Sequence, residues 1–231
     1  MKTEKGGISM ETGWIPVLAV PFVGTALGAG AVLGLPVESE RIQGRMNGFA
    51  AGAMLAALFF NLLLPGTEGG LFWTAFGFGL GLWLLAAVEE WNGRVAPGMV
   101  LMMAVVLHNI PEGMAAGLAG MEHPWTVIGI ALQNIPDGAV VAVPLAAMGM
   151  KKGKAFLLGV LSGAVEPLAA LGANAACGGC AGVEPGMMGF AAGAMVYVVI
   201  RELLPRMGQG KTGAVWFSAG FLLLMVMGGI T

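Results

Sequence analysis

Long apolar runs separated by short polar breaks follow one another along almost the whole chain. Each run has about the length at which a helix crosses a bilayer core, roughly 20 residues. The runs predict eight membrane-spanning helices, near residues 14–34, 44–64, 71–89, 98–120, 124–147, 154–176, 186–204 and 212–230. Little chain remains between them, so we expect an all-α polytopic membrane protein with a single transmembrane domain over residues 1–231.

The composition agrees with this pattern. Hydrophobic residues make up 57% of the chain and charged residues only 10%, and the mean hydropathy is +0.84. A soluble domain carries about 25% charged residues, so the lipid bilayer is the expected surroundings. No basic run indicates a nucleic-acid partner.

The basic residues are distributed unevenly between the two sides. With eight spans, the N-terminus and the second, fourth and sixth loops carry only Lys2 and Lys5. The opposite side holds Arg41, Arg45, Arg94, Lys151, Lys152, Lys154, Arg201, Arg206 and Lys211. The positive-inside rule therefore predicts a multi-pass cell-membrane protein with both termini outside the cytoplasm.

Two sequence repeats indicate internal symmetry. "GFAAGAM" occurs at 48–54 and at 189–195, and both copies run on to "LLP". A weaker pair is "TALGAG" at 25–30 and "AALGAN" at 169–174. The members of each pair lie five spans apart and so run in opposite directions. This order predicts a 3+2+3 inverted repeat, an arrangement typical of secondary transporters with midplane sites.

Two related polar motifs, "LHNIPEG" at 107–113 and "LQNIPDG" at 132–138, lie within the fourth and fifth spans. His108 and Glu112 are four residues apart, as are Gln133 and Asp137, so each pair shares a helix face. Counted at about 1.5 Å per residue, these four residues and Glu166 of the sixth span fall at nearly the same depth, halfway through the bilayer.

The chemistry of this cluster favours a cation. Unpaired charges at this depth cost several kcal/mol each, and no Lys or Arg is expected there to balance them. Oxygen ligands with one imidazole suit a borderline divalent ion. Prolines 111 and 136 break the helical hydrogen bonding, and Asn109 and Asn134 could bind a cation or satisfy the freed backbone.

Other interpretations of the same residues stay open. The cluster could be a structural interhelical hydrogen bond or a proton relay without metal, and Met54 of the first "GFAAGAM" could be a packing residue. Asn61 could mark the outer approach to the site, and Glu202 could lie on the path or extend to the inner surface. Cys177 and Cys180, in "CGGC", are a weak zinc signal and more typical of a local disulfide or idle thiols.

"HNIPEG", "QNIPDG", Glu166-Pro167 and the paired "GFAAGAM…LLP" segments resemble the ZIP (Zrt/Irt-like) metal transporter family, nearest to its compact prokaryotic, GufA-like branch. The resemblance covers essentially the whole chain. It implies uptake of divalent metal into the cytoplasm, with zinc most expected and iron, manganese, cobalt or cadmium as further candidates. It also implies no catalytic cofactor and a possible homodimer.

The resemblance also implies roles for individual residues. His108, Glu112, Gln133 and Asp137 match ligating positions, Asn109 and Glu166 match positions that complete a second metal site, and Met54 matches a thioether contact. Spans one, four, five and six are expected to move against spans two, three, seven and eight. The chain departs from the family at Asp137, which is often Glu, at Asn134, which is Asp in some relatives, and in the loop 90–97, which has no His.

Two other functions use the same residue types. An intramembrane metalloenzyme needs firmly held ligands and a general base, whereas this chain has two histidines and no HExxH motif. A proton-coupled carrier of another solute would need the carboxylates but no metal. The sequence therefore favours a metal transporter rather than an enzyme.

Overall fold

The computed structural model describes residues 14–36, 39–91, 97–119, 124–176, 183–208 and 210–228, and within these ranges every regular element is a helix. In chain order they are α1 (Trp14–Gly34), α2 (Glu40–Ala57), η1 (Leu58–Leu63), α3 (Leu64–Trp91), α4 (Pro97–Ala119), α5 (Pro124–Ala147), α6 (Lys152–Gly163), α7 (Val165–Ala176), α8 (Glu184–Val198), η2 (Val199–Leu203) and α9 (Lys211–Gly228). The two elements η1 and η2 are π-helical.

Five helical stretches of the described chain are long and apolar enough to cross a membrane, and this confirms the polytopic helical class. They are Val17–Gly34, Glu40–Glu90, Val127–Ala147, Lys152–Gly172 and Glu184–Leu203, followed by the shorter apolar helix Lys211–Val226. The 51-residue stretch is more than twice the length that one crossing needs, and its backbone is non-helical at Gly70. It accommodates two crossings, although the total of eight stays a prediction.

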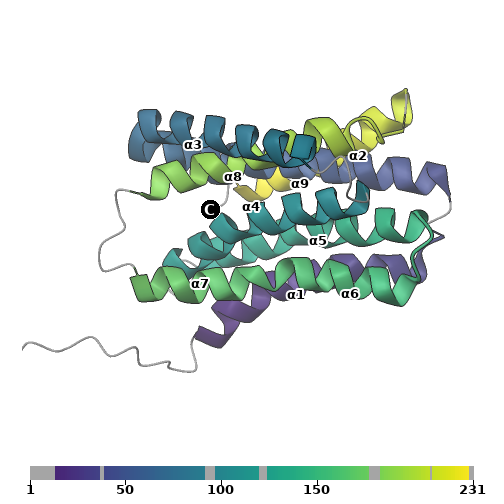
Figure 1. Ribbon diagram of the computed structural model, residues 1–231, viewed down its shortest axis with the longest axis horizontal. Helices are drawn as coiled ribbons and strands as arrows, with labels where there is room; N and C mark the ends of the chain where they lie inside the picture. Colours follow the sequence, from purple (N-terminus) through teal and green to yellow (C-terminus); the bar gives the residue numbers. More distant parts are fainter. Residues whose placement is uncertain are drawn as a thin grey trace, which may run out of the picture.

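The helices form two layers (Figure 1). One layer holds α2, α3, α8 and α9, and the other holds α1, α4, α5, α6 and α7. Within the layers the most extensive pairs are α3 with α8, α2 with α9, α1 with α5 and α4 with α7. Helix packing within lipid depends on such close approach.

The helix pairs follow the sequence repeat. The two "GFAAGAM" copies lie on α2 and α8, and each helix continues into a π-helical segment. Helix α2 packs on α9 as α8 packs on α3, and α1 packs on α5 as α7 packs on α4. An inverted repeat would produce these matching pairs; the 3+2+3 arrangement itself stays a prediction.

The outer surface of the bundle is apolar. On α3, Leu71, Phe72 and Trp83 are 67%, 71% and 63% exposed, whereas the buried interior is rich in alanine and valine. Contiguous exposed apolar surface of this kind indicates a membrane or protein contact. The apolar composition and the candidate spans both indicate that lipid surrounds the bundle.

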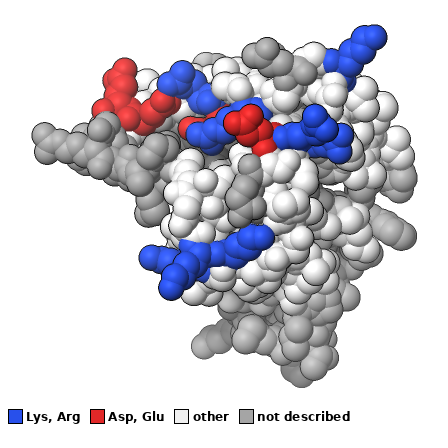
Figure 2. All heavy atoms as spheres, turned by 90° about the vertical axis from the view of Figure 1, so that its right-hand side faces the viewer, with Lys and Arg blue, Asp and Glu red and all other residues white. Residues whose placement is uncertain are grey.

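The described basic residues gather at one end of the bundle, which Figure 2 shows from outside. Contacts between chain segments bring them there: Gly208 N–H donates to Gly44 O at 3.3 Å, and Lys152 Nζ donates to Leu35 O at 2.8 Å. We call this the charged end. It carries the described side chains that the positive-inside rule assigned to the cytoplasm. Arg94, of the same predicted side, lies outside the described residues, as do Lys2 and Lys5 of the opposite side.

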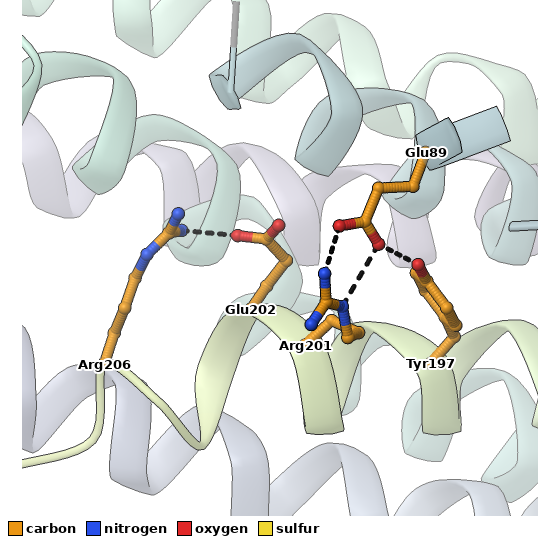
Figure 3. Close-up of polar contacts among 5 residues, drawn as sticks. All are labelled: Glu89, Tyr197, Arg201, Glu202 and Arg206. Carbon is orange, nitrogen blue, oxygen red and sulfur yellow. Dashed lines mark hydrogen bonds and ion pairs between the residues drawn. The ribbon is translucent and has the colours of Figure 1, made fainter. Parts of the chain in front are cut away.

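Ion pairs link neighbouring helices at the charged end (Figure 3). Glu89 of α3 accepts hydrogen bonds from Tyr197 Oη and Arg201 Nε, the latter at 3.1 Å. Arg206 Nη1 lies 2.7 Å from Glu202 Oε2. The contacts of Glu89 fasten α3 to α8 and η2, whereas the Glu202–Arg206 pair joins residues four apart on one segment.

Candidate metal site

Three helices bring the polar motif residues together inside the bundle. Asn109 and Glu112 lie on α4, Gln133, Asn134 and Asp137 on α5, and Glu166 on α7, and none is more than 3% exposed. The approach of α4 to α7 is close because Gly113 has no side chain: a Cβ there would lie 2.3 Å from Glu166 O. Gly113 thus allows α4 and α7, two of the three helices that carry the site residues, to pack closely against each other.

The local sequence explains why Glu166 lies at this depth. Helix α6 ends at Gly163 and α7 begins at Val165, so Glu166 lies in the first turn of α7. Pro167 lacks an N–H, which is tolerated in a first turn. The carboxylate also gains from the positive end of the helix dipole.

One hydrogen-bonded group joins η1, α5 and α4. Asn61 Nδ2 donates to Gln133 Oε1 at 2.9 Å, and Gln133 Nε2 donates to Glu112 Oε1. Gln133 is therefore held between an amide and a carboxylate. Asn61, predicted at the outer approach, is in hydrogen-bond contact with a motif residue.

A second group surrounds Glu166. Thr25 Oγ1 of α1 donates to Glu166 Oε1 at 3.0 Å, and Asn134 Nδ2 donates to Glu166 Oε2 at 2.5 Å. The same amide nitrogen also donates to Pro21 O at 3.2 Å. Both carboxylate oxygens of Glu166 thus have a donor.

The two asparagines bond to neighbouring helices. Asn109 Nδ2 donates to Ser162 O of α6 at 3.1 Å, and Asn134 Nδ2 reaches Pro21 O of α1. Neither of these two bonds goes to a carbonyl that Pro111 or Pro136 leaves without a helical partner. The amide nitrogens are used for holding helices together, which leaves the amide oxygens for another role.

Three buried oxygen atoms of the site have no hydrogen-bond donor within the described chain. They are Asn109 Oδ1, Glu112 Oε2 and Asn134 Oδ1. A buried acceptor left without a partner costs about 1–3 kcal/mol, and native proteins contain few of them. Three together indicate a position for a cation.

The charges of the site also favour a cation. Gln133 and Asn134, which donate to Glu112 and Glu166, lie about one turn from Asp137 on α5, so the three carboxylates share one region of the bundle. Glu112 and Glu166 form no ion pair with a described lysine or arginine, because the ion pairs of Arg201 and Arg206 are with Glu89 and Glu202. Negative charge on these two carboxylates therefore favours a metal ion or bound protons at this place.

The described side chains do not form a closed metal site. No three His, Cys, Asp or Glu side chains among them are arranged to hold one ion, and the side chain of His108 lies outside the description. Amide donors occupy Glu112 Oε1 and both oxygens of Glu166. An ion that used these oxygens would displace the amides.

Met54 and Glu202 take no part in the hydrogen bonds described above for these buried groups. Met54 is 2% exposed and packs in the main apolar core. Glu202 lies at the charged end in an ion pair with Arg206, not with the buried carboxylates (Figure 3). Cys177 and Cys180 fall outside the described residues.

Thr25 and Ser162 belong to the site but were not predicted. Both are fully buried, and they contact Glu166 and Asn109. A signal for Thr25 existed, because it opens the "TALGAG" repeat as a polar residue in an apolar span. Ser162 contributes its backbone carbonyl, which any residue could supply, so no sequence signal marks it.

Comparison with known proteins identifies relatives over most of the chain. The sequence profile of the family described as "ZIP Zinc transporter" matches residues 86–230. The "Zinc transporter ZIPB" of Bordetella bronchiseptica is 37% identical over 243 aligned residues, which cover 90% of this chain and 78% of that protein. The "Zinc transporter GufA" of Myxococcus xanthus is 30% identical over 255, covering 91% and 96%.

A third relative, the "Zinc transporter ZupT" of Corynebacterium efficiens, is 33% identical over 224 aligned residues, which cover 80% of this chain and 84% of that protein. All three relatives carry names of transporters rather than of enzymes. The "HNIPEG" and "QNIPDG" motifs of α4 and α5 lie within the part of the chain that the family profile matches. The chain belongs to the ZIP family of zinc transporters.

Proposed function

We propose that this protein carries divalent transition-metal cations, zinc first, across the membrane into the cytoplasm through the buried polar groups of α4, α5 and α7. The observation that carries the proposal is the set of three buried oxygen atoms without donors within the described chain, beside the buried carboxylates of Glu112 and Glu166, which form no ion pair with a described lysine or arginine. A dication satisfies both deficits at once.

The proposed ligands are the motif residues of the three helices. They are His108, Asn109, Glu112, Gln133, Asn134, Asp137 and Glu166, with Met54 as a further contact that the family resemblance implies. Carboxylate, amide and imidazole groups suit zinc and its neighbours in the first transition row. Because amide groups donate to Glu112 and Glu166, a metal ion bound by these carboxylates would replace amide donors.

Charge balance suggests how transport is coupled. Three ionised carboxylates carry three negative charges, and one dication balances two of them. A proton or a second dication must balance the third, because an uncompensated charge at this depth costs several kcal/mol. The same cost favours protonated carboxylates before a metal enters, so we expect metal entry to release protons from the site.

The test is uptake into proteoliposomes that contain the purified protein. We expect radiolabelled zinc to accumulate above the level of protein-free vesicles. Excess Mg²⁺ should compete weakly because it gives up its water ligands reluctantly, whereas unlabelled zinc should compete fully. Equal zinc accumulation in vesicles with and without protein would contradict the proposal.

A Thr25→Val change should lower zinc uptake by roughly tenfold, the lower range for removing a residue that orients a metal ligand. Thr25 Oγ1 holds Glu166 Oε1, and valine has nearly the same shape but no hydroxyl. The affinity of the purified variant for zinc, measured by calorimetry, should fall in parallel. Thr25→Ser keeps the donor and should restore most of both values.

A further inference from the structure

Two apolar cavities lie where the two layers of helices meet. The first has a volume of about 440 Å³ and lies between α1 and α5 on one side and α2 and α9 on the other. The second has about 500 Å³ and lies between α4 and the pair α3 and α8. Both fall in the range of about 300–1,000 Å³ that is usual for ligand pockets.

The cavities occupy matching places in the sequence repeat. Phe49 and Ile135 line the first cavity, and Phe190 and Ile110 line the second. The two phenylalanines follow the opening glycine of the two "GFAAGAM" copies, and the two isoleucines precede the motif prolines. The second cavity is thus a natural internal comparison for the first.

The two cavities differ in charge. Arg45 lines the first cavity, whereas the described lining of the second contains no charged residue. Arg45 is exposed, and its side chain takes part in none of the ion pairs found in the described chain. A guanidinium without a carboxylate partner is available to an anion.

The first cavity opens to the membrane side of the bundle. Leu27, on its lining, is 65% exposed, and Trp216 is 39% exposed. The lining runs from Arg45, near the charged end, to Pro136 within the α5 motif. It therefore offers an apolar channel with a cation at its membrane-surface end.

We propose that this cavity binds an acyl chain of an anionic phospholipid, whose phosphate contacts Arg45. The acyl chain matches the apolar lining, and guanidinium groups bind phosphate through paired hydrogen bonds. The lipid belongs to the leaflet at the charged end, where basic side chains attract anionic headgroups. The second cavity takes an acyl chain without selecting the headgroup.

The test uses the full-length protein in micelles with equal amounts of phosphatidylglycerol and phosphatidylcholine. Native mass spectrometry measures the ratio of the two lipids retained on the protein, with no metal present, so the outcome does not depend on transport. The wild type should retain phosphatidylglycerol preferentially. Arg45→Gln should reduce this preference about fivefold, the effect of one basic residue near an anionic headgroup.

Matched variants separate this site from general surface charge. Lys154→Gln removes an exposed charge of the same end that does not line the cavity, and it should leave the preference unchanged. Arg45→Lys should keep most of it. Ala31→Phe, which fills the cavity, should lower the total retained lipid. An unchanged preference in Arg45→Gln, or an equal loss in Lys154→Gln, would overturn the proposal.

Discussion

Replacing Glu112 by glutamine should lower zinc uptake by about 100-fold or more. Loss of a residue that only orients a ligand costs about 10–100-fold, and Glu112 is itself a proposed ligand. Its Oε2 is buried without a donor, and its Oε1 accepts from Gln133. Glutamine keeps the shape of the side chain but removes its charge and brings an N–H₂ group to the position proposed for the cation. Initial uptake rates in proteoliposomes measure the effect.

The control for this substitution is Glu40→Gln. Glu40 is an exposed glutamate at the start of α2, so the same chemical change there should leave uptake at the wild-type rate. Size-exclusion profiles of both variants should match that of the wild type. Wild-type uptake by Glu112→Gln would remove this carboxylate from the transport site and would leave the family assignment intact.

A Gly28→Ala change should destabilise the protein by roughly 1–3 kcal/mol, the usual cost of overpacking a close contact. A Cβ at residue 28 would lie 1.8 Å from Ile135 O, so α1 and α5 would have to separate. Ile135 lies between Asn134 and Asp137, so the proposed metal site would be disturbed with the packing. The apparent melting temperature in detergent should fall by about 2–10 °C.

Gly30→Ala provides the comparison in the same helix. A Cβ at residue 30 meets no atom within 4 Å, and alanine favours the helix more than glycine does. Its melting temperature should equal or slightly exceed that of the wild type. A fall of the same size in both variants would mean that the contact with α5 is not the cause.

The sequence pattern predicted where the helices lie along the chain better than it predicted which helices pack against each other. The spans at 14–34 and 124–147 coincide with α1 and α5, and the span that begins at residue 71 follows the break at Gly70. Apolar length is a local property, so it can be read along the chain. The pairing of α1 with α5, or of α2 with α9, depends on where glycines of distant segments meet a backbone.

The same division holds for the candidate site. The motif spacing and the depth estimate predicted that Glu112, Asp137 and Glu166 lie near one another. In the structure, Gln133 and Asn134, about one turn from Asp137 on α5, donate to Glu112 and Glu166. The sequence could not predict which oxygen atoms stay without donors. That depends on the direction of each amide, which is set by Pro21 O, Ser162 O and Asn61 on other helices.

The π-helical turn η1 has a consequence for Gln133. A π-turn holds one residue more than an α-turn, and one residue corresponds to about 100° of helix rotation. Asn61 lies within this turn and donates to Gln133 Oε1. Rewinding η1 into a regular α-helix would turn Asn61 by about that angle and break its hydrogen bond to Gln133 Oε1, which would free this oxygen to accept from another partner.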